Sequence, residues 1–101
     1  MNIRKAMENE QIVLNLNGRL DTTTAPDFQQ SLLEEIKTGK NIILDFSELA
    51  YVSSAGLRSL LTGQKAVAAG GQTMVLRHVS EEIMEVFDMT GFSDILTIET
   101  A

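Results

Sequence analysis

Segments with a strand pattern alternate along this chain with segments that have a helix pattern, and this alternation constrains the fold most. In residues 11–18 every second residue is apolar (Ile12, Leu14, Leu16), which predicts a strand with one buried face. Residues 41–46, NIILDF, form a continuous apolar run of strand length, as expected for a central strand. Strands that alternate with helices are typically parallel and joined by crossovers. We therefore expect an α/β fold.

The other elements are expected to continue this alternation. Thr24 and Asp27 have the spacing of a capping box, and Gly39 is expected to end the helix that follows. Ser80 is the expected N-cap of a later helix that stops before Gly91. The expected strands cover residues 3–7, 11–18, 41–46, 72–79 and 94–99, and the expected helices lie near 26–38, 54–69 and 81–90. Because the first two strands can form a hairpin, the sheet should be mixed.

The composition is that of an ordinary globular domain and limits the possible partners. The 101 residues are 44% apolar and 22% charged, which fits a single domain over residues 1–101. With no cysteine and one histidine, neither a disulfide nor a metal site is expected. Fourteen acidic residues against eight scattered basic ones give a net charge of −6, which argues against nucleic acid as a ligand. No apolar stretch has the length of a membrane span, so we expect no membrane insertion and a cytoplasmic location.

Two adjacent serines, Ser53 and Ser54, follow an apolar segment and precede leucines at helical spacing. Three interpretations are open: a helix cap, a catalytic nucleophile and a phosphorylation site. An N-cap is the commonest role of a serine at a helix start. A nucleophile elbow is disfavoured because Val52 occupies the place of its first glycine, and the only histidine, His78, precedes a helix instead of lying late in the chain. We therefore expect no enzyme activity, and no motif predicts a bound cofactor.

Gly56 is unusual inside the first turn of the expected helix, where glycine costs about 1 kcal/mol relative to alanine. A glycine at this position would let another protein approach the backbone beside Ser54. A phosphate on Ser54 would add a charge of about −1.5 to −2 at a helix N-terminus, which tolerates an anion, so the fold should survive. A docked partner would instead meet a desolvated like charge. The serine pair is therefore a candidate switch for binding.

Four segments resemble the successive sequence blocks of the STAS domain family, and within it of the anti-sigma-factor antagonists. These segments are GRLDTTTAPDF, NIILDFSELAYVSSAGLRSLL, AAGGQTMVL and EVFDMTGFSDIL, and the resemblance extends from about Gly18 to Ile98. The serine-glycine-leucine block that follows a strand is the most specific of them. The resemblance implies a mixed sheet of four or five strands with helices mainly on one face.

The resemblance also implies a role in partner switching that regulates transcription. The unphosphorylated protein would bind an anti-sigma factor that is itself a serine kinase, and so release a sigma factor; the kinase would then phosphorylate it, and a PP2C-type phosphatase would restore it. Phosphorylation in the family falls two residues before the glycine, which is Ser54 here, and Asp21 matches an acidic residue in a nearby loop. Ser53 stands where many phosphorylated members have aspartate, so it is a second candidate acceptor. The expected partner-binding residues are Asp21, Thr22, Thr23, Ser53, Ser54, Ala55, Gly56, Leu57 and Arg58.

An alternative within the same family is a STAS subunit that is not phosphorylated. Such a subunit would belong to a lipid-transport or stress-signalling assembly and would dock constitutively through the same helix face. Replacement of Ser54 by aspartate would then leave binding unaffected.

Overall fold

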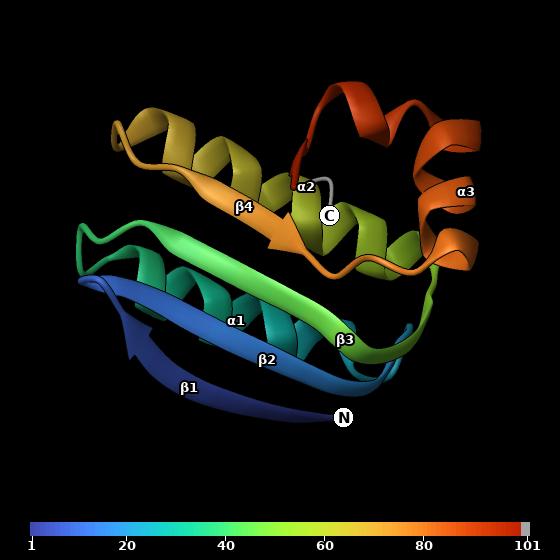
Figure 1. Ribbon diagram of the computed structural model, residues 1–101, viewed down its shortest axis with the longest axis horizontal. Coiled ribbons are helices and arrows are strands. Elements are labelled where there is room, and N and C mark those ends of the chain that lie inside the picture. The colour runs from blue at the N-terminus through green and yellow to red at the C-terminus, as the bar shows by residue number, and fades with distance from the viewer. Residues whose placement is uncertain (100–101) are drawn as a thin grey trace.

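A computed structural model describes residues 1–99 as a five-stranded sheet packed against helices (Figure 1). The elements in chain order are β1 (Asn2–Glu8), β2 (Gln11–Leu20), α1 (Ala25–Ile36), β3 (Ile42–Val52), α2 (Ser54–Ala69), β4 (Met74–Arg77), α3 (Glu81–Thr90), the 3-10 helix η1 (Phe92–Asp94) and β5 (Thr97–Ile98). The strands are ordered β1-β2-β3-β4-β5 across the sheet. β1 pairs with β2 in antiparallel fashion, and all other pairs are parallel. The expected order of elements and the mixed α/β sheet are confirmed.

Helices α1 and α2 cover one face of the sheet and lie side by side behind it in Figure 1. Ile12, Leu14 and Leu16 of β2 point into this layer and are buried, as their alternation in the sequence predicts. They share one core with Phe28 and Leu32, whose spacing of four residues places both on one face of α1. The hydrophobic core therefore lies between the sheet and these two helices.

Helix α3 lies beyond the carboxyl ends of β3 and β4 instead of covering the sheet (Figure 1). Phe87 of α3 packs against Phe46 of β3, with the two ring centroids 6.2 Å apart. The hydroxyl oxygen of Ser80 accepts a hydrogen bond from the backbone N–H of Ile83 at 3.2 Å, and Gly91 ends the helix with a φ of 81°. The N-cap and the glycine stop expected for this helix are confirmed.

Three strands differ clearly in length from the expectation, and one of them, β4, covers Met74–Arg77 instead of 72–79, because only these four residues pair with β3. β3 continues past residue 46 to Val52, because its second half pairs with β2 as far as the Leu20–Val52 pair, through two register shifts. β5 is confined to Thr97–Ile98, because Gly91 is followed by the turn of η1 before the chain reaches the sheet. The extension of β3 depends on pairing between distant segments, whereas β5 is shortened by the local turn of η1.

The two ends of α1 also differ from the expected caps. Thr24 occupies the N-cap position, but its hydroxyl donates to the carbonyl oxygen of Arg19 at 2.8 Å and makes no hydrogen bond to the helix. The capping box predicted from Thr24 and Asp27 is therefore wrong. The helix ends at Ile36, and Gly39, with a φ of 84°, belongs to the turn that follows.

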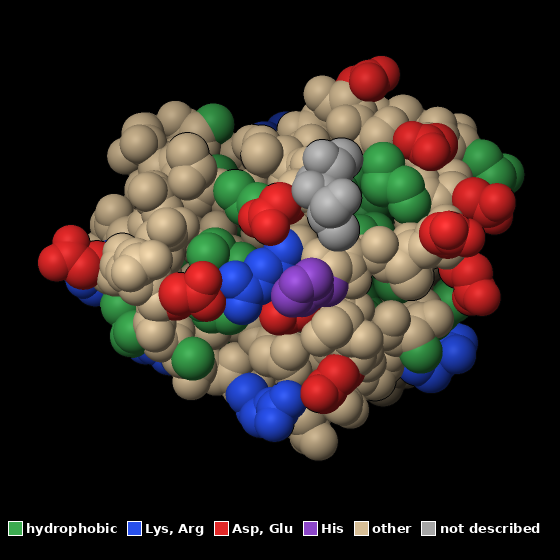
Figure 2. Space-filling model, viewed as in Figure 1, with side chains coloured by type: hydrophobic (Ala, Val, Ile, Leu, Met, Phe, Trp, Pro, Cys, Tyr) green, Lys and Arg blue, Asp and Glu red, His purple; other side chains and the backbone are tan. Residues whose placement is uncertain are grey.

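Within residues 1–99 the opposite face of the sheet carries no helix, and charged side chains bridge it instead (Figure 2). Arg77 on β4 places its Nε 3.2 Å from Oδ2 of Asp45 on β3, and its Nη1 3.1 Å from the carboxylate of Glu8 on β1. Since β3 and β2 separate β4 from β1, the second ion pair crosses the sheet. Val13 and Ile43 point to this face and are buried, so both faces of the central strands are partly covered.

Candidate functional site

The N-termini of α1 and α2 lie together at one edge of the sheet. β2 and β3 are parallel neighbours, so their carboxyl ends meet there, and each strand leads directly into a helix. The backbone N–H of Ser53 donates to the carbonyl oxygen of Leu20 at 2.8 Å, which fixes the loop before α2 against the loop before α1. Residues predicted as one site from distant parts of the sequence are therefore brought together.

The structure gives the two adjacent serines different environments. Ser53 is the N-cap of α2, is half-buried, and its hydroxyl oxygen accepts a hydrogen bond from the backbone N–H of Gly56 at 3.2 Å. Ser54 is the first residue of the helix and is exposed. Within residues 1–99 the Ser54 hydroxyl forms no hydrogen bond, so it is accessible to another molecule. The cap and the accessible hydroxyl, which the sequence left as alternative roles, are divided between the two residues.

Gly56 is buried, and the space beside it is filled by this chain itself. A Cβ atom on Gly56 would lie 2.8 Å from Cγ of Leu20, 2.9 Å from the carbonyl oxygen of Leu20 and 3.1 Å from Cγ1 of Val52. The close backbone approach that the sequence suggested does occur, but its partner is the end of β2 and not another protein. Leu57 is also buried, at 6% exposure. Gly56 and Leu57 therefore pack inside this chain, beneath the exposed residues of the predicted site.

The loop before α1 is organised by Asp21. Its Oδ1 accepts hydrogen bonds from the backbone N–H groups of Thr24 at 3.1 Å and Thr23 at 3.0 Å. The bond from Thr24 contributes most to lowering the pKa of the Asp21 carboxyl, against the opposing effect of desolvation. Thr22 and Thr23 remain exposed beside it. Asp21 therefore shapes the loop through an Asx turn and supplies a negative charge near the serine pair.

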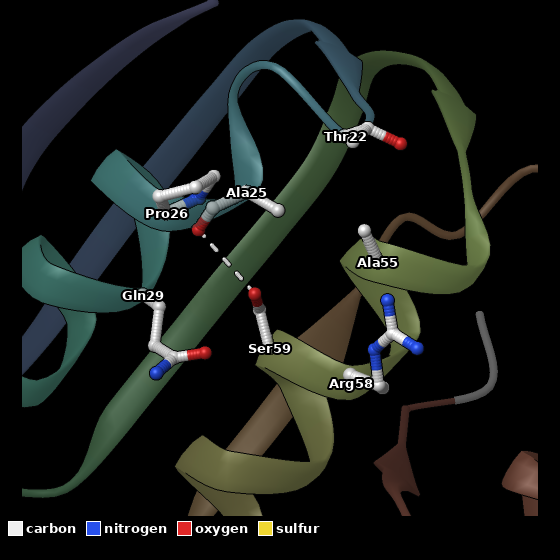
Figure 3. A pocket seen from close by; sticks show the side chains of 7 residues that line it. All are labelled: Thr22, Ala25, Pro26, Gln29, Ala55, Arg58 and Ser59. Atoms are coloured by element: carbon white, nitrogen blue, oxygen red, sulfur yellow. Dashed lines mark hydrogen bonds between the residues drawn. The ribbon is translucent and has the colours of Figure 1, made fainter.

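A groove of about 440 Å³ separates the first turns of α1 and α2 (Figure 3). It is lined by Thr22, Ala25, Pro26, Gln29, Ala55, Arg58 and Ser59. The hydroxyl of Ser59, which is buried, donates to the carbonyl oxygen of Ala25 at 3.3 Å and ties the two helices together at the base of the groove. Arg58 is exposed on the α2 side. The groove is open and largely uncharged, as suits a segment of a protein partner.

Tyr51 is a further surface residue at this edge of the sheet, which the sequence patterns did not single out. Tyr51 is 41% exposed, and the guanidinium carbon of Arg19 lies 4.2 Å from the centroid of its ring. Arg19 also lies 3.9 Å from the Asp21 carboxylate. Arg19 and Tyr51 face each other as a pair between β2 and β3. This contact depends on the register of the two strands, which local sequence patterns do not predict.

His78 lies on the face of the sheet that carries no helix within residues 1–99, beside Asp45. Its Nδ1 is 3.1 Å from Oδ1 of Asp45, and its backbone has a φ of 57°. No hydrogen bond joins His78 to Ser53 or Ser54 in the part of the chain that the structure describes. Among the same residues no group of acidic and histidine side chains is arranged to hold a metal ion, and no helix combines the length and apolar character needed to cross a bilayer. The site offers an exposed surface that carries the hydroxyl-bearing residues Ser54, Thr22 and Thr23.

Comparison with known proteins agrees with this architecture. The family model described as STAS domain matches residues 2–101. The anti-sigma-B factor antagonist of Bacillus subtilis is 26% identical over 98 residues, which cover 97% of this chain and 90% of that protein. An anti-sigma factor antagonist from Mycobacterium paratuberculosis has the same fold, with a TM-score of 0.88 at 15% identity over 99% of this chain and 86% of that one.

The Bacillus cell fate determinant SpoIIAA has been solved in a phosphorylated form. It matches with a TM-score of 0.73 and 22% identity, covering 98% of this chain and 92% of that one. The likeness in structure shows the shared fold, and the match to the family model over nearly the whole sequence shows the family. The chain belongs to the STAS domain family.

Proposed function

We propose that this chain is an anti-sigma-factor antagonist whose binding to an anti-sigma factor is switched off by phosphorylation of Ser54. The observation that carries the proposal is the exposed hydroxyl of Ser54, which makes no hydrogen bond within residues 1–99 and lies beside the groove between α1 and α2. Ser53 is a poorer acceptor because its hydroxyl is half-buried and caps α2. The names of the relatives, several of which are anti-sigma-B factor antagonists, support the choice of partner. The phosphorylated form of SpoIIAA supports the chemistry.

The chemistry of the switch requires an enzyme on the partner side. In the proposed cycle the anti-sigma factor is a serine kinase: the Ser54 oxygen attacks the γ-phosphorus of ATP, the bond to ADP breaks, and a base of the kinase takes the hydroxyl proton. A PP2C-type phosphatase then hydrolyses the phosphoserine with water and releases inorganic phosphate. Both steps take place where sigma factors act, so the proposed location is the cytoplasm.

The physical effect of the phosphate is electrostatic. It adds a charge of about −1.5 to −2 on an exposed residue of the docking surface, without entering the core. A docked partner would desolvate this charge and lose contact with the groove, which is expected to cost several kcal/mol of binding free energy. The fold stays intact while binding is lost.

The test is phosphorylation by serine kinases of the anti-sigma type from the same genome, with the phosphate mapped by mass spectrometry. We expect one phosphate on Ser54, its loss in S54A and its retention in S53A. Calorimetry should show that the unmodified protein binds the kinase at least tenfold more tightly than the phosphorylated protein. Phosphate found only on Thr22–Thr24 or Ser80 would refute the assigned site. Unchanged binding by S54D would instead indicate a STAS subunit that docks constitutively in a larger assembly.

A further inference from the structure

Arg58 differs from the other arginines of the chain. Arg4, Arg19 and Arg77 each form an ion pair with an acidic residue, at 3.2, 3.9 and 3.1 Å respectively. Within residues 1–99, Arg58 forms no ion pair and is exposed. It is also the one charged residue among those that line the groove between α1 and α2. A cation kept without a partner beside a docking groove is available to an anion from outside.

Arg58 and Ser54 lie on the same face of α2. They are four residues apart, which brings side chains of a helix to within about 6 Å at Cβ. In Figure 3 the guanidinium of Arg58 extends from its backbone toward Ala55, that is, toward the N-terminus of α2. The accessible hydroxyl and the unpaired cation are therefore neighbours on one surface.

We propose that Arg58 binds an acidic side chain of the partner in the unmodified protein, and that a phosphate on Ser54 captures Arg58 from that acid. The inference rests on the proposed function and assigns the partner a carboxylate at the groove. Phosphate and guanidinium form paired, charge-assisted hydrogen bonds, and a group four residues away on the same helix competes at a high effective concentration. Phosphorylation of Ser54 would thus add negative charge to the surface and also pair with Arg58, so that the guanidinium is no longer available to the partner.

The proposed contact between the Ser54 phosphate and Arg58 is tested without the partner. Protein with phosphoserine incorporated at position 54 during translation is titrated by ³¹P NMR, and the second pKa of the phosphate is followed. In R58Q this pKa should shift upward relative to the wild type, with R58K between the two. K65Q removes a charge from the same helix at a position about 16 Å from Ser54 along the helix axis, at 1.5 Å per residue. This variant should leave the phosphate titration unchanged. The same titration curve for wild type and R58Q would overturn the pairing.

The proposed contact between Arg58 and the partner is tested by a double-mutant cycle with the kinase identified through Ser54 phosphorylation. R58Q should weaken binding of the unmodified protein roughly tenfold, as expected for the loss of one charged hydrogen bond, while K65Q should not. Phosphorylation should then weaken kinase binding by R58Q roughly tenfold less than it weakens kinase binding by the wild type. If phosphorylation weakens both proteins equally, this inference is wrong and the proposed function stands. If phosphorylation leaves wild-type binding unchanged, the proposed function and this inference both fail.

Discussion

Ser53 and Ser54 have identical side chains but different environments, because Ser53 precedes the helix as its N-cap and Ser54 is the first helical residue. Ser53 is still extended, with a ψ of 175°, and its oxygen faces the free N–H groups of the first turn. Ser54 has already entered the helix, and its side chain points outward. A cap must be held, whereas the proposed phosphoacceptor must be free, so the two requirements are met by two different residues.

This division predicts different effects of two alanine substitutions. S53A should lower the free energy of unfolding by about 1 kcal/mol, because the bond to the Gly56 N–H is lost. S54A should change it by less than about 0.5 kcal/mol, since it removes an exposed hydroxyl that makes no hydrogen bond in residues 1–99. Urea denaturation of the three proteins measures both values. Equal stability of the two variants would show that Ser53 does not act as the cap.

At the level of the element, α2 is held close to its neighbours by glycines. Gly56 approaches the end of β2, and at Gly63 a Cβ atom would lie 2.5 Å from Cδ2 of Leu32 on α1. Both positions are buried, so the helix tolerates residues of low helix propensity in exchange for close packing. The position of the proposed docking surface depends on this packing because Ser54 and Arg58 lie on the same helix.

G56A tests the close approach. Its Cβ atom would lie 2.9 Å from a backbone carbonyl that cannot rotate away, and the expected loss is about 1–3 kcal/mol of unfolding free energy. The better helix propensity of alanine offsets this only in part. Thermal unfolding, with S54A as a control substitution in the same helical turn, measures the difference. A G56A protein as stable as the control would mean that the first turn of α2 can move away from β2.

At the scale of the whole molecule, one carboxylate links the sheet to the segment before α3. Asp45 is 7% exposed and accepts hydrogen bonds from the Ser47 backbone N–H and from Arg77, with His78 3.1 Å away. Burial alone would raise the pKa of Asp45, but the bonds from Ser47, His78 and Arg77 outweigh it and lower the pKa to about 2. Since Arg77 also reaches Glu8, this network spans the open face from β1 to β4.

The lowered pKa predicts a pH dependence of stability. A carboxylate whose pKa is lower in the folded state than in the unfolded state stabilises the fold above the unfolded value, and this contribution is lost as pH falls toward the folded value. Wild-type protein should therefore lose about 2 kcal/mol between roughly pH 4 and pH 2 through Asp45. D45N should lack this component, whereas D88N, at an exposed position on α3, should retain it. Urea denaturation across this pH range gives the answer, and identical curves for D45N and the wild type would contradict the assignment.

Phosphorylation of Ser54 should leave the whole molecule folded. The modified residue is exposed at the first position of α2, where the helix dipole favours an anion by about 0.3–1 kcal/mol. The melting temperature of the phosphorylated protein should therefore lie within about 8 °C of the unmodified value, and no lower than it. Scanning calorimetry of both forms checks this. A large drop in melting temperature would mean that the switch acts by unfolding and not by blocking a surface.

Local patterns in the sequence were sufficient for much of the fold. The alternation in residues 11–18, the apolar run at 41–46 and the serine and glycine that bound α3 all act within one turn or one strand, so short segments carry the signal. These patterns, together with the family resemblance, also led to the prediction that Ser54 and the loop at Asp21 form the site. The length of β3 was missed because it depends on pairing with β2, and the cap at Thr24 was missed because its hydroxyl bonds to the carbonyl oxygen of Arg19, five residues earlier, instead of to the helix.

By itself the sequence determined the elements, their order and the chemical groups available at the site. Only the tertiary structure decided which serine is accessible, that Gly56 faces Leu20, and that Arg58 has no acidic neighbour in residues 1–99. The physical reason is that propensity and periodicity act between residues a few positions apart, whereas burial and pairing depend on residues that meet only when strands and helices pack.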